Sequence, residues 1–99
     1  MSVFNDIPEQ HWIIETDYFF VVKDKYPVTE GHLLIISKRK AVDFFALNEN
    51  EQTELATTIN LSKQYLNDTY GKTDYNIGMN CGEYAGQTVF HFHCHLIPR

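Results

Sequence analysis

The strongest constraint on the fold of this chain is a strict alternation of side chains from residue 89 to residue 97. Successive side chains of a β-strand point to opposite faces of the sheet. One set is Phe90, Phe92, Cys94 and Leu96, and the other is Val89, His91, His93, His95 and Ile97. The pattern therefore predicts a strand with one apolar core face and one face that carries three imidazoles. Pro98 is expected to end the pairing.

Other stretches also read as strands, because they are rich in aromatic and β-branched residues or alternate in polarity. They are a hairpin over 11–15 and 18–23, a buried strand over 33–36, and a strand over 74–80. Asp24, Pro27 and Gly31 favour a loop over 24–32, and residues 81–86 favour a turn. We expect these strands to pair in antiparallel fashion.

A long helix is predicted over residues 49–70. Asn48 and Glu51 have the spacing of a capping pair, and Gly71 occupies the place of a left-handed C-terminal cap. Apolar or small residues recur at helical spacing between them: Leu55, Ile59, Ser62, Leu66 and Tyr70. Residues 41–47 could add two helical turns. The expectation is one α+β domain over residues 1–99, with the long helix against one face of the sheet.

Composition narrows the functional classes. The net charge of −5 argues against a protein that follows a nucleic-acid backbone by bulk electrostatics. The N-terminus lacks an apolar signal core, and no apolar run approaches the ~20 residues of a membrane span. Two cysteines, Cys81 and Cys94, are expected to be free thiols in a reducing cytoplasm. Cys94 is expected to pack in the core, whereas Cys81 is expected to have no special role.

Two chemistries compete for the histidine row. Alternate histidines such as His91 and His93 could bind zinc. A third ligand would come from elsewhere in the chain, and the candidates are His11, Asp24, His32 and Cys81. Alternatively, one neutral imidazole attacks phosphorus while its neighbours position it. Residues 86–88 (Gly-Gln-Thr) offer backbone, amide and hydroxyl donors for phosphate. A nucleotide-binding module with little catalysis is the third hypothesis.

Residues 85–99 (AGQTVFHFHCHLIPR) resemble the signature of the histidine triad (HIT) family, in which three histidines alternate with apolar residues. Upstream, Asp24 with Gly31-His32 and the apolar strand 33–36 resemble an earlier block of the family, and Asn80 also matches. The resemblance covers roughly residues 11–99. It implies a HIT-like fold, a five-stranded antiparallel sheet with helices, usually paired as a homodimer. Many relatives continue for tens of residues beyond the triad, and we expect this chain to lack that tail.

The resemblance also implies an activity. HIT proteins cleave nucleoside phosphates at the α-phosphorus through a nucleotidyl-histidine intermediate, with no cofactor and no metal in the catalytic centre. Phosphoramidates and diadenosine polyphosphates are both substrates of the family, and the residues leave that choice open. The expected partner is a small nucleotide, with neither nucleic acid nor membrane.

Roles follow position by position from the same resemblance. His93 resembles the nucleophile, His95 would contact the α-phosphate and assist the leaving group, and His91 would be structural with His32 as its hydrogen-bond neighbour. Asp24 would hold the ribose hydroxyls, and the base would lie against Ile7 and Val22. The full set expected to bind nucleotide is Asp24, Asn80, Gly86, Gln87, Thr88, Val89 and His95.

Overall fold

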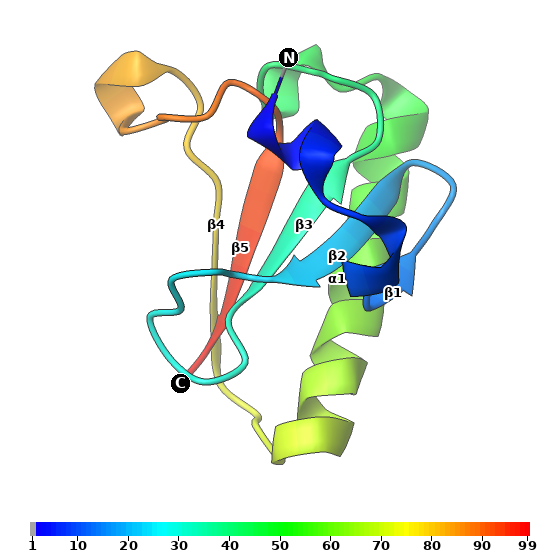
Figure 1. The fold of residues 1–99 in the computed structure, drawn as a ribbon, viewed down its shortest axis with the longest axis vertical. Helices are drawn as coiled ribbons and strands as arrows, with labels where there is room; N and C mark the ends of the chain where they lie inside the picture. Colours follow the sequence, from blue (N-terminus) through cyan, green and yellow to red (C-terminus); the bar gives the residue numbers. More distant parts are fainter. Residues whose placement is uncertain (1) are drawn as a thin grey trace.

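The computed structural model describes residues 2–99. Within these residues, a five-stranded antiparallel sheet in the order β1-β2-β3-β5-β4 is joined by one α-helix, α1 (Glu49–Tyr70). The strands are β1 (Ile14–Glu15), β2 (Phe19–Lys23), β3 (Leu33–Ser37), β4 (Tyr75–Gly78) and β5 (His93–Pro98). In Figure 1, α1 lies on one face of the sheet. The N-terminal segment, which holds the 3-10 helices Val3–Asp6 and Glu9–His11, crosses the other face. The predicted α+β class and antiparallel sheet are confirmed.

Helix α1 begins and ends where local chemistry predicts. The side chain of Asn48 accepts from the backbone N–H of Glu51, and the Glu51 carboxylate accepts from the backbone N–H of Asn48. This reciprocal pair satisfies two N–H groups that the first turn leaves free. At the other end Gly71 adopts φ +68°, and its N–H donates to the Asn67 carbonyl. Left-handed backbone of this kind favours glycine, which therefore ends the helix.

The sheet is buried on both faces. The face under α1 packs Phe19, Val21, Leu33, Ile35 and Leu96 against helix residues that include Leu55 and Leu66. On the opposite face, Phe20, Val22, Leu34 and Ile36 pack against Phe4 from the N-terminal segment. All five residues of β3 are therefore buried. This explains why its sequence is a continuous apolar run without alternation.

Strand β5 confirms the predicted division of faces but begins later than the alternation suggests. Phe92, Cys94 and Leu96 lie in the core under α1, whereas His91, His93 and His95 lie on the opposite face. Regular pairing starts at His93, not at residue 89. The partner strand β3 ends at Ser37, and the N–H of Phe92 donates to the carbonyl of Ala41 instead. Phe90 consequently lies outside the core and is exposed, contrary to the prediction.

Two other segments are less regular than predicted. The short helix expected over 41–47 is a single 3-10 turn, Phe44–Ala46. The carboxylate of Asp43 caps its beginning by accepting from the N–H groups of Phe45 and Ala46, and the backbone is already extended at Leu47. The hairpin expected from residue 11 begins at Ile14. His11 belongs to a 3-10 helix, Glu9–His11, and is exposed, but it is not on a strand surface.

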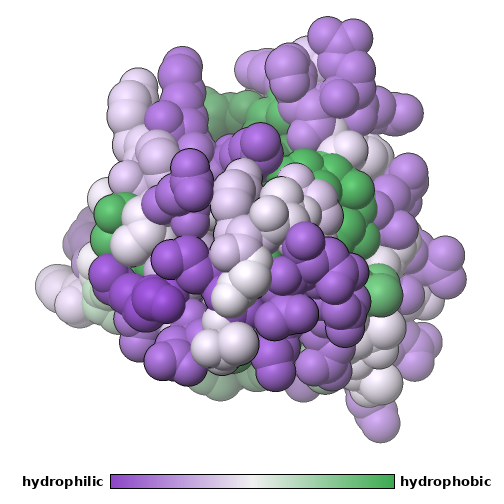
Figure 2. All heavy atoms as spheres, turned by 90° about the horizontal axis from the view of Figure 1, so that it is seen from below, coloured by the Kyte–Doolittle hydropathy of each residue, from purple (hydrophilic) through white to green (hydrophobic). Residues whose placement is uncertain are grey.

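The thiol of Cys94 is fully buried, which confirms its predicted core position. Burial raises its pKa to about 11, so the reactive thiolate is suppressed. Among residues 2–99, no helix combines the length and apolar character needed to cross a membrane. Figure 2 shows that hydrophilic residues cover most of the end of the molecule seen from below.

Candidate active site

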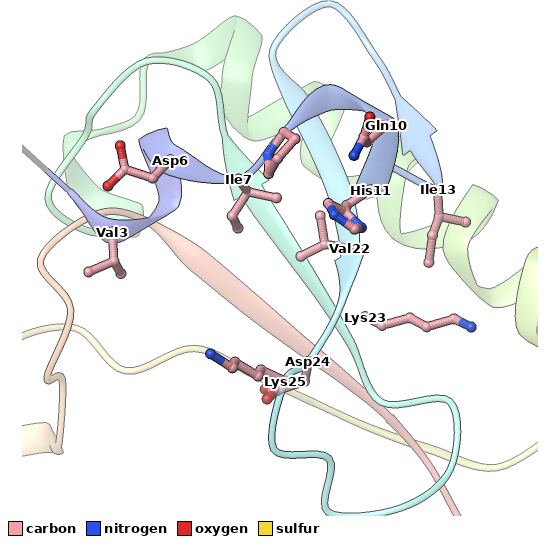
Figure 3. A pocket seen from close by; sticks show the side chains of 11 residues that line it. Val3, Asp6, Ile7, Gln10, His11, Ile13, Val22, Lys23, Asp24 and Lys25 are labelled. Atoms are coloured by element: carbon pink, nitrogen blue, oxygen red, sulfur yellow. The ribbon is translucent and has the colours of Figure 1, made fainter.

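A cavity of about 750 Å³ opens between the N-terminal segment and the end of β2. Its apolar wall includes Ile7 and Val22, the two residues predicted to contact a base (Figure 3). Asp24, just beyond β2, also lines it. Apolar surface with a carboxylate at its edge is suited to a nucleoside, with the base on the wall and the ribose hydroxyls at the carboxylate.

The ring of His93 is held in one tautomer by its own strand. Its Nδ1 lies 2.9 Å from the backbone carbonyl oxygen of His91. Because a carbonyl oxygen only accepts, Nδ1 must carry the proton. In the neutral ring, Nε2 is therefore left with its lone pair free. The ring of Phe4 packs edge-to-face against His93, with centroids 5.0 Å apart, and restricts its rotation.

His91, at the beginning of the row, is buried and bonded to the backbone. It is 1% exposed, and its Nε2–H donates to the carbonyl oxygen of Ser37 over 2.6 Å. This bond joins the end of β3 to the segment just before β5, where regular pairing of the two strands ends. Burial lowers the pKa of His91, which keeps the ring neutral.

His95 is oriented by His32, which lies in the loop before β3. The backbone N–H of Val28 donates to Nδ1 of His32, so the proton of the neutral ring is on Nε2. That N–H lies 2.9 Å from Nδ1 of His95, which must accept. The free nitrogen of His95, Nε2, is then an N–H donor. His93 and His95, whose ring centroids are 5.4 Å apart, thus present a nucleophilic lone pair and a hydrogen-bond donor side by side.

This arrangement corrects the predicted pairing of His32 with His91. Leu34 is paired with His95 and Leu33 with Leu96, so the same register places His32 across from Ile97 and diagonal to His95. His91 lies beyond the other end of the paired region. The structural role predicted for His91 is consistent with its burial, but its partner is the Ser37 carbonyl.

Asp24 connects the cavity to the histidines. One carboxylate oxygen, Oδ1, accepts from the N–H of Tyr26. The other, Oδ2, lies 3.3 Å from Nε2 of His32 and 3.9 Å from Nδ1 of His95. Burial is the main cause that lowers the pKa values of His32 and His95, and the Asp24 charge opposes it. Both rings are therefore neutral at pH 7.

Acidification is expected to weaken folding from about pH 6.5 downward. Because the folded pKa values of His32, His91 and His95 lie below the ordinary 6.5, the unfolded chain takes up protons first. This stabilisation is complete above pH 6.5 and is lost as the pH falls through the folded values. Urea unfolding at several pH values between about 8 and 5 measures it. The lowered pKa of Glu51 makes stability depend on pH only below about pH 4.5.

The His32→Gln variant provides the control for this pH dependence. Its stability is expected to fall less steeply over the same pH range, because one of the three groups is gone. A wild-type stability that stays constant from pH 8 to pH 5 would contradict the neutral, buried state of the rings.

Residues 86–88, which the sequence predicts to bind phosphate, come shortly before the triad, and the side chain of Gln87 bonds to neighbouring backbone groups. Gln87 is buried: its Oε1 accepts from the N–H of Gly82, and its Nε2 donates to the carbonyls of Val42 and Val89. A phosphate contact by the Gln87 amide would therefore require these bonds to be exchanged. Thr88 is exposed beside it.

Asn80 and Gly86 lie together at the other side of this loop. The Asn80 amide donates to the carbonyl of Gly86 over 3.4 Å, and both residues are exposed. Val89 is half-buried and packs against the core cluster that contains Phe4. The nucleotide-binding roles of these residues stay predictions from the family resemblance.

Sequence reasoning missed Phe4, which contacts both His91 and His93, at centroid distances of 5.6 and 5.0 Å. A lone aromatic residue far from the triad in sequence carries no local signal of that contact. It also missed the backbone N–H of Val28, which donates to Nδ1 of His32. Within residues 2–99, the side chains that could gather around a metal ion are Asp24, His32 and His95. His91 and His93, the pair considered for zinc, are not in that group.

The five-stranded antiparallel sheet carries three imidazoles on alternate residues, one just before β5 and two on it, as in histidine triad proteins. A model of the HIT domain matches residues 6–99, and the chain therefore belongs to the HIT family. A HIT-like protein of Mycoplasma genitalium is 39% identical over 86% of this chain and 60% of its own length. A bis(5'-nucleosyl)-tetraphosphatase of Schizosaccharomyces pombe is 37% identical over 74% of this chain and 40% of its own length. The chain thus spans three fifths or less of these two relatives.

Solved structures show the same fold. The NitFhit protein of Caenorhabditis elegans superposes with a TM-score of 0.89 at 33% identity, over 94% of this chain and 23% of that one. The diadenosine triphosphate hydrolase of Plasmodium falciparum gives 0.89 at 29% identity, over 94% and 63%. A zinc-bound histidine triad protein of Mycobacterium smegmatis gives 0.84 at 32%, over 98% and 70%.

Proposed function

We propose that this chain is a nucleotide hydrolase or transferase that cleaves an adenine nucleotide at the α-phosphorus, with His93 as the nucleophile. The observation that carries the proposal is the tautomer of His93, whose Nδ1–H is committed to the His91 carbonyl. The lone pair on Nε2 is thereby aimed away from the strand without a proton to remove first. Relatives that are named as dinucleoside tetraphosphatase and diadenosine triphosphate hydrolase support the substrate class.

The chemistry has two steps. The Nε2 lone pair of His93 forms a bond to the α-phosphorus while the bond to the leaving group breaks, and the leaving group takes that electron pair. The ring becomes a cation that keeps its Nδ1–H. Its hydrogen bond to the His91 carbonyl is then charge-assisted and stronger. Water attacks the same phosphorus in the second step, releases the nucleoside monophosphate and a proton, and restores neutral His93.

His95 and Asp24 assist without forming bonds to phosphorus. The Nε2–H of His95 would donate to a phosphoryl or leaving-group oxygen, and this donor is positioned by the relay from Val28 through His32. Asp24 would accept from the ribose hydroxyls at the edge of the cavity. The remaining expectations stay with this proposal: a homodimer, a cytoplasmic location, and a single domain whose partner is a small nucleotide.

The decisive experiment is rapid-quench mass spectrometry with two substrates, an adenosine phosphoramidate and diadenosine tetraphosphate, each with and without EDTA. We expect released AMP and a transient adenylyl adduct on His93, with turnover unaffected by EDTA because no step uses a metal ion. The faster substrate identifies the branch of the family. AMP binding without adduct or turnover would instead support a nucleotide-binding module, and loss of activity with EDTA would support metal-dependent hydrolysis.

A further inference from the structure

Three potential ligand atoms converge at the junction of the cavity and the histidine row. The distances are 2.9 Å from His32 Nε2 to His95 Nδ1, 3.3 Å from His32 Nε2 to Asp24 Oδ2, and 3.9 Å from His95 Nδ1 to Asp24 Oδ2. Zinc binds nitrogen and oxygen ligands at ~2.0–2.2 Å with tetrahedral geometry, which places neighbouring ligand atoms about 3.3–3.6 Å apart. The three observed distances lie on both sides of this spacing. Small side-chain shifts would therefore place the three ligand atoms at three corners of a tetrahedron around the ion.

The chemical state of the three groups is also right for a metal ion. Metal ligation needs neutral imidazole and an ionised carboxylate. Nδ1 of His95 already presents a lone pair at this point, because it accepts the hydrogen bond from the Nε2–H of His32. Asp24 lines the cavity of about 750 Å³, which supplies both an entry path and water for the fourth corner.

We propose that Asp24, His32 and His95 bind a divalent cation of the zinc class, and that the ion blocks nucleotide binding by occupying the Asp24 carboxylate. The block rests on the proposed function, whereas the binding itself does not. The ion would take the place of the proton between His32 and His95. That proton moves to Nδ1 of His32, so none is released overall. The N–H of Val28 then loses its acceptor, and the loop over 24–32 should loosen.

Binding can be read directly by titrating the metal-free protein with Co²⁺, which absorbs strongly in the visible region when it is tetrahedral, and then displacing it with Zn²⁺. We expect one tetrahedral site per chain. Asp24→Asn keeps the shape of the side chain but removes the anionic ligand, and it should weaken Co²⁺ binding by about 100-fold or more. Asp6→Asn is the matched control, since Asp6 is a second carboxylate of the same cavity but is not in the cluster.

His32→Gln tests the second ligand, and circular dichroism establishes whether each variant is folded. Hydrogen exchange of the Val28 amide should accelerate in the zinc-bound protein. The absence of a tetrahedral band in the wild type, or a band that survives Asp24→Asn but is lost in Cys81→Ser, would overturn the proposal.

The competition with nucleotide is measured by adding AMP to the Co²⁺ protein. AMP should reduce the tetrahedral band, and excess Zn²⁺ should weaken AMP affinity at least tenfold. Tighter AMP binding in the presence of Zn²⁺ would overturn the inhibitory part. If the chain binds no AMP in any condition, the proposed function fails, while the visible band still decides whether the cation site exists.

Discussion

Replacing His93 with alanine is expected to lower kcat/KM for nucleotide cleavage by about four orders of magnitude or more, as removal of a catalytic nucleophile does elsewhere. The fold should survive, because His93 is only half-buried and its ring bonds to a carbonyl of its own strand. We expect the free energy of unfolding to change by no more than about 1 kcal/mol. Steady-state kinetics and urea unfolding measure the two effects separately.

Two further variants distinguish chemistry from packing. In His93→Gly, added imidazole should restore part of the turnover by entering the vacated space and attacking phosphorus in place of the missing ring. Ile97→Ala changes the same face of β5 outside the site and should retain activity. If His93→Ala retains more than trace activity, or if it unfolds, His93 is not the nucleophile that we propose.

One residue away, Phe92→Ala should produce the opposite result: a large loss of stability. Phe92 is 1% exposed, packs edge-to-face on Phe19 with centroids 6.0 Å apart, and lies in the core under α1. Truncating a buried phenylalanine costs about 3–5 kcal/mol, which is a large part of the stability of a small domain. We expect the Tm to fall by roughly 12 °C or more.

The matched control is Phe45→Ala, which removes the same side chain from a position that is 77% exposed. Its effect should stay within about 0.5 kcal/mol. Differential scanning calorimetry of the two variants makes the comparison. Similar losses in both would mean that Phe92 is not the buried core residue, or Phe45 not the exposed one, that the structure indicates.

Elements that are specified by neighbouring residues could be predicted from sequence. The bounds of α1 follow from Asn48, Glu51 and Gly71, which act within one turn of the helix ends. The buried strand β3 follows from its uninterrupted apolar run. The start of β5 could not be predicted in this way. It depends on where β3 ends and on the distant Ala41 carbonyl that accepts from Phe92.

In the candidate site, too, features set by neighbouring residues could be predicted, whereas features set by tertiary contacts could not. Alternation alone predicted that His91, His93 and His95 share a face, because the period of a strand is local. The partner of His32 depends on the register between β3 and β5, which no short segment encodes. A shift of the register by two residues would have placed His32 across from His95 or Arg99 and not from Ile97. The packing of Phe4 on the row is likewise set by a tertiary contact alone.

Gly31 immediately precedes His32 and has almost no freedom to change. Its φ is +92°, and a Cβ there would lie 3.1 Å from Leu66 and 3.2 Å from both Pro98 and Tyr70. A replacement is strained at this φ and crowds side chains at the ends of α1 and β5, so we expect the loop that carries His32 to shift. A mutational survey scored by activity alone would therefore rank Gly31 with the nucleophile, although it offers no chemical group. Pairing such a survey with a measurement of protein abundance would separate residues that react from those that only hold the loop in place.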